Sequence, residues 1–532
     1  EKPFVSCEFS HSMGNSTGNF DEYTELTETE PLYQGGFIWD YVDQAMEATN
    51  AGGESYLGYG GDFADRPHDA DFSGNGIMFA DRTPSPKLVQ VKHDYQNFHI
   101  TVQHDRVILK NLSLFEGTEP YRFVAVLTKN GERVREDELP VRVAAGSEAI
   151  YLLPYDARVI SAERSDGEYL VTVSVLLKKD RSYAPAGYEV AFGQSEGFGR
   201  YLDDTLVRIA AKTHESRKKS GAAQKAPAME ECVYNVGVHG EYMAEGAKEH
   251  MRFHYIFNRG NQAFLSMNLK QSAIQKYMPA KELLYRPLRP NFWRAPVQND
   301  IGNGMPARQG IWKLISENLT AALTQTKRET DGTVMICYEY RTPLCEGVLC
   351  TVTYRVNAAG LIKVTMESDG FTGLPDLPEF GMCTALPLFY DNLRWYGRGM
   401  EETYADRKSG SRIGCYHNLV MDNVAHYLFP QETGNHTDVR FADITDADGC
   451  GLHILYDGHN PLNVSALPYL PQELETARHS FELPKPYETV IRISSMQMGV
   501  GGDDSWGAPV HKPYLIPAEG KKTCSFYLLP LA

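Results

Sequence analysis

The sequence predicts a mainly β protein, in which a short barrel segment precedes two regions of β-sandwich. Three observations lead to this prediction. The first 95 residues alternate strand-like and helix-like runs, residues 96–211 carry short alternating runs separated by turns, and residues 230–532 form one long β-rich region. Between the last two regions, residues 212–229 are rich in Lys, Ser and Ala without apolar periodicity, so we expect a surface linker there.

The opening segment, residues 1–95, is typical of two βα units. A strand-like run at Phe4 and Val5 is followed by a stretch with apolar residues at helical spacing, 20–29. The second strand, predicted at 36–42, is apolar enough to be buried on both faces, as parallel strands are. Because two strands cannot close a barrel that needs eight, we expect the last quarter of a (β/α)₈ barrel whose earlier strands lie on another piece of sequence.

Residues 96–211 predict a small antiparallel sandwich of immunoglobulin type. The runs 98–102, 123–127 and 169–173 alternate apolar and polar residues, and Asn130-Gly131 is a typical hairpin turn. Residues 230–532 show the same alternation over longer runs. We expect the small sandwich to serve packing and spacing rather than chemistry.

Composition limits the partners and the compartment. The formal net charge of −17 argues against nucleic acid and anionic membranes as partners. No apolar run approaches the roughly 18 residues that a membrane-spanning helix needs. The nine cysteines are an odd number without a Cys-x-x-Cys pair, so we expect most of them to be reduced and buried. That pattern favours a reducing compartment, and we expect the cytoplasm.

Six motifs, which keep their order along the whole chain, carry a family resemblance. They are Cys-Glu-Phe-Ser-His-Ser-Met-Gly-Asn-Ser at 7–16, Gln-Gly-Gly-Phe-Ile-Trp-Asp at 34–40, Gly-Gly-Asp-Phe at 60–63, Asn-Gly at 75–76, Asn-Asp-Ile-Gly at 299–302 and Gly-Gly-Asp-Asp-Ser-Trp at 501–506. In these motifs the chain resembles the C-terminal portion of the large bacterial β-galactosidases of the lacZ type, retaining enzymes of glycoside hydrolase family 2. The resemblance implies that residues 230–532 form a two-sheet supersandwich similar to galactose mutarotase. It also implies an absence, because the family's general acid/base precedes residue 1.

Glu8 is the candidate nucleophile that this resemblance implies. Retaining cleavage of a glycosidic bond needs two carboxyl groups about 5 to 5.5 Å apart, one to attack the anomeric carbon and one to protonate the departing oxygen. A nucleophilic carboxylate must stay ionised, so we expect hydrogen-bond donors near Glu8. The alternative is a strand-end glutamate in an ordinary salt bridge.

The resemblance also assigns substrate contacts. His11 would bind sugar hydroxyls, Trp39 would form an apolar floor under the galactose ring, and Trp506 would form a platform for the leaving sugar. The alternatives are a solvated loop histidine and two packing tryptophans. The motifs at 291–296, 395–399 and 431–435 are rich in Gly, Arg and Asn, and we favour a structural role for each.

A partial sodium site is implied at Phe72 and Asn75, where the family uses a backbone carbonyl and a side-chain oxygen, and Asn75 thereby also lies at the galactose site. Hard cations take oxygen ligands, so these residue types are suitable. The intact enzyme would bind Mg²⁺ and Na⁺, but the remaining sodium ligand and all magnesium ligands would precede residue 1. Complete metal sites are therefore not expected in this chain.

The leading hypothesis is a β-galactosidase that hydrolyses terminal non-reducing β-D-galactose by double displacement. Its partners would be a β-galactoside and the missing N-terminal portion of the same enzyme, and the intact enzyme would form a homo-oligomer. We expect the chain by itself to be inactive, since it lacks the acid/base. One alternative is a non-catalytic carbohydrate-binding or assembly module, and another is a related hydrolase for glucuronides or mannosides.

Overall fold

The computed structural model describes residues 2–103, 105–155, 166–201, 226–243, 250–271 and 281–531. These residues form two compact units. One unit contains 1–88, 209–408 and 416–532, and the other contains 89–208 and 409–415. Within the described ranges, no helix has both the length and the apolar character needed to cross a membrane.

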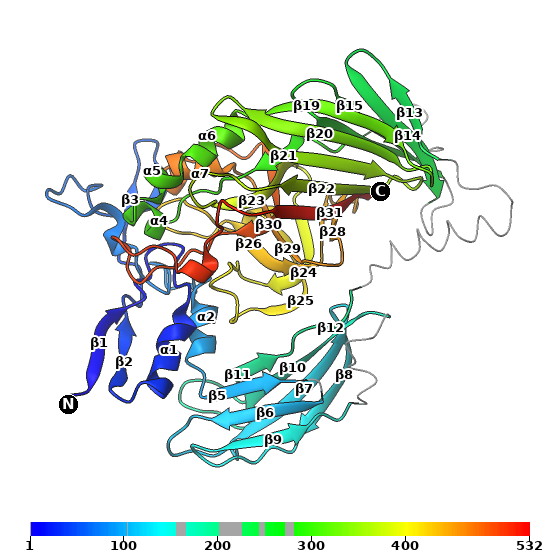
Figure 1. The fold of residues 1–532 in the computed structure, drawn as a ribbon. Helices are drawn as coiled ribbons and strands as arrows, with labels where there is room; N and C mark the ends of the chain where they lie inside the picture. The colour runs from blue at the N-terminus through cyan, green and yellow to red at the C-terminus, as the bar shows by residue number, and fades with distance from the viewer. Residues whose placement is uncertain are drawn as a thin grey trace. The chain divides into compact units, whose positions relative to one another are not determined.

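The chain opens with a parallel βαβ unit (Figure 1). Strand β1 (Phe4–Phe9) pairs in parallel with β2 (Tyr33–Ile38), and helix α1 (Phe20–Thr29) connects them. Phe20 at the start of α1 is fully buried, as the apolar spacing predicts. A parallel pair of strands joined by a helix is the repeating unit of a (β/α)₈ barrel, as the prediction of a partial barrel requires.

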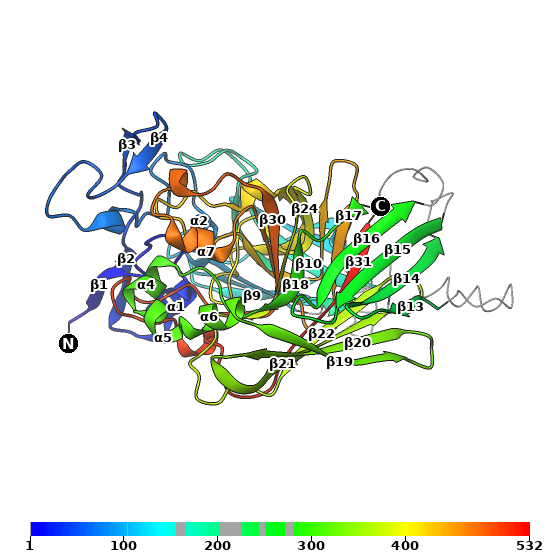
Figure 2. The ribbon, with the colours of Figure 1, turned by 90° about the horizontal axis from the view of Figure 1, so that it is seen from above.

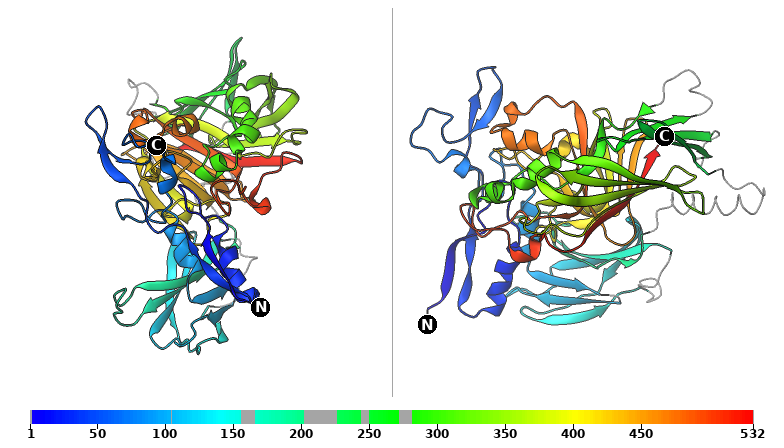
Figure 3. Two further views of the ribbon diagram at one scale, coloured as in Figure 1. Left: turned by 90° about the vertical axis from the view of Figure 1, so that its left-hand side faces the viewer. Right: turned by 45° about the horizontal axis from the view of Figure 1, so that its top comes forward.

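Strand β2 differs from its prediction in both extent and burial. It ends at Ile38 rather than Val42, and Phe37, Trp39 and Tyr41 are 66%, 48% and 64% exposed. The expectation of a strand buried on both faces is wrong because β1 is its only strand neighbour in the described part of the chain. The next helix also comes later than a simple βα unit requires. A projecting hairpin (Figure 3) and a 3₁₀ turn come first: β3 (Met46–Thr49), β4 (Ser55–Gly58) and η1 (Ala70–Ser73), followed by α2 (Leu88–Asp94).

The second unit is a sandwich of two antiparallel sheets, as predicted. Its described residues form a three-stranded sheet in the order β5-β6-β9 and a five-stranded sheet in the order β11-β10-β7-β8 with β12 beside β10. The turn between β7 and β8 is at Asn130-Gly131, where both residues have positive φ, 51° and 83°. The strands are β5 (Phe98–Val102), β6 (Arg106–Asn111), β7 (Tyr121–Lys129), β8 (Glu132–Leu139), β9 (Glu148–Leu152), β10 (Glu168–Leu177), β11 (Glu189–Gln194) and β12 (Phe198–Gly199).

The rest of the first unit is dominated by two large antiparallel sheets (Figure 2). Among the described residues, one has ten strands: β13 (Ala228–Glu231), β14 (Asn235–Met243), β15 (His250–Asn258), β16 (Phe264–Gln271), β17 (Lys281–Glu282), β18 (Arg286–Asn291), β23 (Glu379–Pro387), β26 (Asn435–Val439), β29 (Leu462–Leu467) and β30 (Glu488–Gln497). The other has nine: β19 (Thr320–Arg328), β20 (Val334–Thr342), β21 (Cys345–Val356), β22 (Ile362–Ser368), β24 (Asn392–Gly399), β25 (Arg412–Leu419), β27 (Phe441–Thr445), β28 (Gly451–Tyr456) and β31 (Lys522–Leu531).

The two large sheets pack face to face as a supersandwich. Alternate residues of β21 are buried, and the ring of Tyr354 lies 5.2 Å from that of Phe257 on the other sheet. The hydroxyl of Tyr255 donates to the carbonyl of Gly360 at 2.7 Å across the same interface. Short helical segments connect the strands: α4 (Gln298–Gly302), α5 (Met305–Gln309), α6 (Ile311–Glu317), α7 (Pro471–Thr476), η2 (Val420–Asn423), η3 (Ser480–Glu482) and η4 (Lys512–Tyr514).

Two further predictions meet the structure only in part. Most of the predicted linker, 212–225, lies outside the described residues, and strand β13 already begins at Ala228. All nine cysteines are free thiols, as expected, but Cys350 and Cys524 are the buried ones and the others are partly or fully exposed. The prediction that most cysteines are buried is wrong because many of them lie on the solvent side of a strand or in a loop.

Candidate active site

Glu8 lies near the end of β1, close enough to Asp504 for that charge to act on its carboxyl group. The ring of Phe9, the next residue, packs on Phe20 and Tyr23 of α1 at centroid distances of 5.6 and 4.9 Å. The pairing of β1 with β2 is irregular between Ser6 and Phe9, so the alternation of a regular strand does not fix the direction of Glu8. Its position near the end of β1 is one where (β/α)₈ barrels carry catalytic side chains.

The Glu8 carboxylate has little support from the described residues. It is half-buried, it accepts no hydrogen bond from them, and it forms no ion pair with them. Burial raises its pKa, and the negative charge of Asp504 raises it further. The expectation of hydrogen-bond donors beside Glu8 is therefore wrong for this chain. The physical reason is that β1 has a described strand neighbour on one side only, so the barrel strand that would lie on its other side is not part of these residues.

The loop after β1 is fully buried and is held by the supersandwich. The backbone amide of Asn15 donates to Gln431 at 2.9 Å, and its side-chain amide donates to the carbonyl of Glu432 at 2.7 Å and the hydroxyl of Tyr404 at 3.0 Å. The guanidinium of Arg407 donates to the carbonyl of Ser16 at 2.5 Å. The loop after β1 is thus positioned by a region more than 380 residues away in sequence.

Lys87 ties this loop to the Asn75 loop. Its buried ammonium donates to the carbonyls of Ser12 and Gly76, at 2.5 and 2.7 Å. Burial lowers the pKa of Lys87 to about 7, against the opposing charge of Asp43. Two loops that carry candidate substrate contacts therefore share one cation.

His11 is buried and neutral at pH 7. Its Nδ1 lies 2.8 Å from the hydroxyl of Ser505, and Nε2 has no hydrogen-bond partner among the residues that the structure describes. Burial, followed by the nearby positive charge of Lys87, lowers the pKa of His11 to about 4. The interpretation of His11 as a merely solvated loop histidine does not agree with its exposure of 4%.

Trp39 and Asn75 join the site through their backbones. The carbonyl of Trp39, just beyond β2, accepts from the amide of Ser12 at 2.8 Å, and the carbonyl of Asn75 accepts from the amide of Asp40 at 2.6 Å. The indole of Trp39 is half exposed, so in this chain it is not a packed core residue. An exposed indole beside the end of β2 is available to stack on a sugar ring.

Trp506 comes from the other end of the chain to the same place. Its ring contacts that of His11 edge-on at 5.2 Å and is 56% exposed. Asp504 shapes its loop by accepting from the amides of Trp506, Gly507 and Ala508 at 2.8 to 3.0 Å. The structure thus brings the segments that carry His11, Trp39, Phe72, Asn75 and Trp506 together near the end of β1, which carries Glu8.

Phe72 and Asn75 partly fit a hard cation. The side-chain amide of Asn75 donates to the carbonyl of Phe72 at 2.6 Å, and the Oδ1 atom of Asn75 is buried without a partner among the described residues. Two oxygens are fewer than such an ion takes, and the described residues contain no cluster of three or more His, Cys, Asp or Glu that could hold a metal. The pair is therefore part of a cation site at most.

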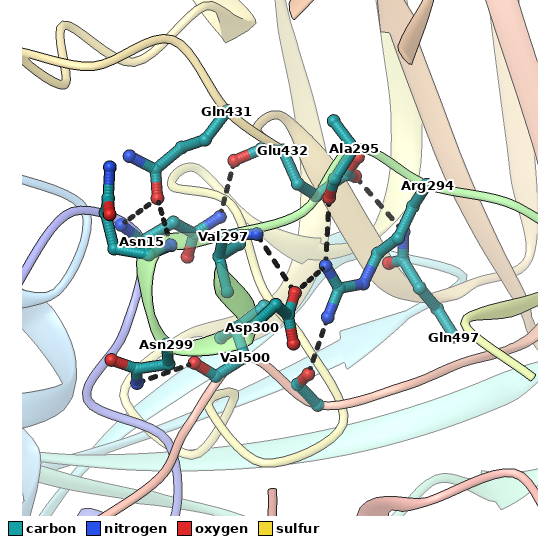
Figure 4. Close-up of polar contacts among 12 residues, drawn as sticks. Asn15, Arg294, Ala295, Val297, Asn299, Asp300, Gln431, Glu432, Gln497 and Val500 are labelled. Atoms are coloured by element: carbon teal, nitrogen blue, oxygen red, sulfur yellow. Dashed lines mark hydrogen bonds and ion pairs between the residues drawn. The ribbon is translucent and has the colours of Figure 1, made fainter. Parts of the chain in front are cut away.

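A buried polar network lies next to the loop after β1 (Figure 4). Arg294 pairs with Asp300 at 2.7 Å, and both side chains are fully buried. Arg492 pairs with Glu379 at 2.9 Å and also with Glu432. These residues come from or adjoin the motifs for which a structural role is favoured, and they hold the backbone that binds Asn15 rather than facing Glu8.

Sequence reasoning did not single out Lys87, Asn299 or Ser505. The last two stand inside motifs that carry the resemblance, but their hydrogen bond joins positions 206 residues apart. Lys87 follows Pro86 in a stretch with no metal, nucleotide or catalytic spacing. The motifs therefore mark the neighbourhood of Asn299 and Ser505 but not their contact, and no local signal marks Lys87.

The buried His11 makes the stability of the chain depend on pH. Its pKa is about 4 in the folded state against 6.5 for the free side chain, so between these values the unfolded chain binds more protons. The stabilisation is complete above pH 6.5 and is lost as the pH falls to about 4. We expect about 2 kcal/mol from His11 after allowance for solvent screening.

This prediction is checked by urea unfolding of wild type and His11→Gln at pH 7.5, 5.5 and 4. The difference in the free energy of unfolding between the two proteins should shrink as the pH falls. His436, which is also buried with a pKa of about 3, stays in both proteins and cancels. A difference that does not change with pH would contradict the prediction.

Three family models match the chain. A model described as "Glycosyl hydrolases family 2, TIM barrel domain" matches residues 1–100, "Beta-galactosidase, domain 4" matches 107–196, and "Beta galactosidase small chain" matches 250–528. The fold and these matches define the chain as part of a family 2 glycosyl hydrolase.

The curated relatives of the chain are named β-galactosidases, which narrows the class within family 2. The chain is 38% identical to the β-galactosidase of Halalkalibacterium halodurans over 98% of the chain and 48% of the relative. It is 39% identical to β-galactosidase BgaC of Bifidobacterium adolescentis, over 98% of the chain and 46% of the relative. It is 36% identical to the β-galactosidase of Streptococcus thermophilus, over 100% of the chain and 48% of the relative.

The chain belongs to the lacZ-type β-galactosidase family, and it spans about half the length of the curated relatives it matches. A solved homologue of GalM/aldose epimerase from C. elegans covers 56% of the chain with a TM-score of 0.24 and 6% identity. That likeness is too low to support an argument about the supersandwich.

Proposed function

We propose that this chain is the nucleophile-bearing C-terminal portion of a β-galactosidase that hydrolyses terminal non-reducing β-D-galactose with retention. The observation that carries the proposal is the placement of Glu8 near the end of a parallel strand, close to Asp504 in the loop whose Trp506 contacts His11. The β-galactosidase names of the relatives supply the substrate class.

In the proposed mechanism, Glu8 attacks the anomeric carbon and forms a covalent galactosyl ester while the aglycone leaves. Water then cleaves the ester at the same carbon, so that two inversions give retention. His11, Trp39 and Asn75 bind the galactose, and Trp506 contacts the leaving group. A neutral His11 adds no positive charge, which leaves Glu8 without a cationic partner among the described residues.

The remaining parts of the active site belong to the missing N-terminal portion, which would supply the acid/base and close the barrel over the open edge of β1. Phe37 and Tyr41, exposed in this chain, lie on the segment that the added strands would adjoin. We therefore propose that the chain alone is inactive. The parallel β1/β2 pair with its helix weighs against the alternative of a non-catalytic assembly module.

The same proposal also concerns the bound cations, the oligomeric state and the cellular compartment. Asn75 Oδ1 and the carbonyl of Phe72 would hold Na⁺ against a sugar hydroxyl, and Mg²⁺ would bind wholly in the missing portion. The intact enzyme would be a homo-oligomer. The nine free thiols agree with the cytoplasm.

The test mixes this chain with a second chain that supplies the first six βα units and measures nitrophenol released from a nitrophenyl β-galactoside. Activity should appear only in the mixture, and the first sugar product should be β-galactose. β-Glucuronide and β-mannoside substrates, tested alongside, should react far more slowly. A stable two-chain complex without galactosidase activity would refute the proposal.

Trp506→Ala should weaken the leaving-group site selectively. Aromatic stacking contributes about 0.5–1.5 kcal/mol beyond area, so we expect kcat/KM for the nitrophenyl galactoside to fall about tenfold in the mixture. Inhibition by free galactose should hardly change, because galactose does not occupy the leaving-group site. Tyr234→Ala, at another aromatic ring that is 75% exposed, is the control and should alter neither value. Equal loss of galactose binding in Trp506→Ala would contradict the assignment.

A further inference from the structure

Three successive hydrogen bonds connect the ring of His11 to the backbone of Val500. The side-chain amide of Asn299, in α4, donates through Nδ2 to the carbonyl of Val500 at 3.2 Å (Figure 4). Its Oδ1 lies 2.7 Å from the hydroxyl of Ser505, and that hydroxyl lies 2.8 Å from Nδ1 of His11. Asn299, Ser505 and His11 are 1%, 2% and 4% exposed, so water does not compete for these bonds.

The donor and acceptor in each of these hydrogen bonds can be assigned by starting from the carbonyl of Val500. A backbone carbonyl can only accept, so the NH₂ group of Asn299 must face Val500, and the reversed amide would bring two oxygens together. Oδ1 of Asn299 is then an acceptor, and the hydroxyl of Ser505 gives its one proton to it. The Ser505 oxygen must therefore accept from His11, which requires a proton on Nδ1.

The packing of the loop keeps Ser505 in this position. A Cβ atom at Gly302 would overlap the carbonyl oxygen of Ser505, so the glycine allows the loop to lie directly on the end of α4. The loop is held from the other side by Asp406, which accepts from the amides of Val500 and Gly501 at 3.1 and 2.7 Å. Ser505 is thus set between two fixed backbones.

We propose that Ser505 and Asn299 are positioning residues that hold neutral His11 as its Nδ1–H tautomer, so that Nε2 accepts a hydrogen bond from a hydroxyl of the bound sugar. The tautomer of His11 is a property of this chain alone. The statement that a sugar hydroxyl donates to Nε2 rests on the proposed function. The lone pair on Nε2 has no partner among the described residues and lies in a ring flanked by Trp506 and Phe72, at 5.2 and 6.1 Å.

This direction has a chemical consequence for the ligand. The hydroxyl that meets Nε2 must be a donor, so fluorine, which cannot donate, should not replace it. The same hydroxyl oxygen keeps its lone pairs for other donors or for a cation. A histidine with the opposite tautomer would instead donate to the sugar and would tolerate fluorine better than hydrogen at that position.

The first experiment measures the ¹⁵N spectrum of the ring nitrogens in the 532-residue chain labelled at histidine, by solid-state NMR at pH 7.5. Comparison with His11→Gln assigns the two His11 signals. Wild type should show protonated Nδ1 and unprotonated Nε2. Ser505→Ala should move the proton toward Nε2, because the Nδ1–H then loses its acceptor. Ser495→Ala is the control and should leave the spectrum unchanged.

The second experiment uses the two-chain mixture and non-hydrolysable thiogalactosides in which the hydroxyls beyond C2 are replaced in turn by hydrogen or fluorine. For the hydroxyl that meets Nε2, both replacements should weaken binding about tenfold in wild type. That loss should fall to about twofold or less in Ser505→Ala.

The outcomes separate the two proposals. A proton on Nε2 in wild type overturns the inference, whatever the mixture does. A fluorine that binds as well as the hydroxyl at every position overturns it as well. The Nδ1–H tautomer together with a stable but inactive mixture supports the bond direction and overturns the proposed β-galactosidase function instead.

Discussion

Glu8→Gln should abolish hydrolysis of a nitrophenyl β-galactoside by the two-chain mixture, with a loss in kcat on the order of 10³-fold or more. The amide keeps the size of the carboxylate but cannot attack the anomeric carbon, so no galactosyl ester forms. Glu8 is half-buried and bonds no described side chain, so the substitution should leave the folding of the chain unchanged. The measurement is the initial rate at saturating substrate, with circular dichroism to check the fold.

Glu25→Gln is the matched control, because Glu25 lies on α1 and is exposed. It should retain full activity. A complementary variant, Glu8→Ala, leaves space for a small anion. Azide added to it should attack the anomeric carbon directly, displace an activated aglycone such as dinitrophenolate, and give α-galactosyl azide by one inversion. Full activity in Glu8→Gln would remove Glu8 from the mechanism.

Arg492→Met should destabilise the first unit by about 3–5 kcal/mol. The guanidinium pairs with Glu379 at 2.9 Å and also with Glu432, and these carboxylates are 2% and 0% exposed. Without Arg492, two buried negative charges lose their partner. Burial already raises the pKa of Glu379, and loss of the guanidinium raises it further. The penalty should therefore be larger at pH 8 than at pH 5, where protonation removes part of the charge.

The measurement is urea unfolding followed by tryptophan fluorescence. All five tryptophans (Trp39, Trp293, Trp312, Trp395 and Trp506) lie in the first unit, so the signal reports on it. Arg252→Met removes an exposed pair with Glu241 and is the control, with an expected loss below about 1 kcal/mol. Equal stability of Arg492→Met and Arg252→Met would show that the buried ion pairs of Arg492 do not stabilise the first unit.

The features that sequence predicted correctly depend on neighbours in the chain. Helix α1 follows from apolar residues at helical spacing, β5 follows from alternation, and the hairpin at Asn130-Gly131 follows from residues that tolerate positive φ. The family also came from local motifs, because its residues are contiguous. Each of these features is encoded within about ten residues.

The features that sequence missed depend on distant or absent partners. Strand β2 has apolar residues suited to burial, but its exposure depends on how many strands lie beside it. The hydrogen-bond donors expected near Glu8 were inferred from what a nucleophile needs, and the described residues do not supply them. Lys87 gives no signal in sequence, and only the fold shows that its ammonium joins two loops.

The sequence by itself determined the family, the mainly β fold class and the identity of the candidate nucleophile, because motifs and periodicity are read over short stretches of chain. Only the tertiary structure decided which charge lies near Glu8, what holds Asn15, and which nitrogen of His11 carries the proton. These depend on hydrogen bonds between residues hundreds of positions apart, such as His11 and Ser505. Burial fixes the direction of such bonds, and burial is a property of the folded chain.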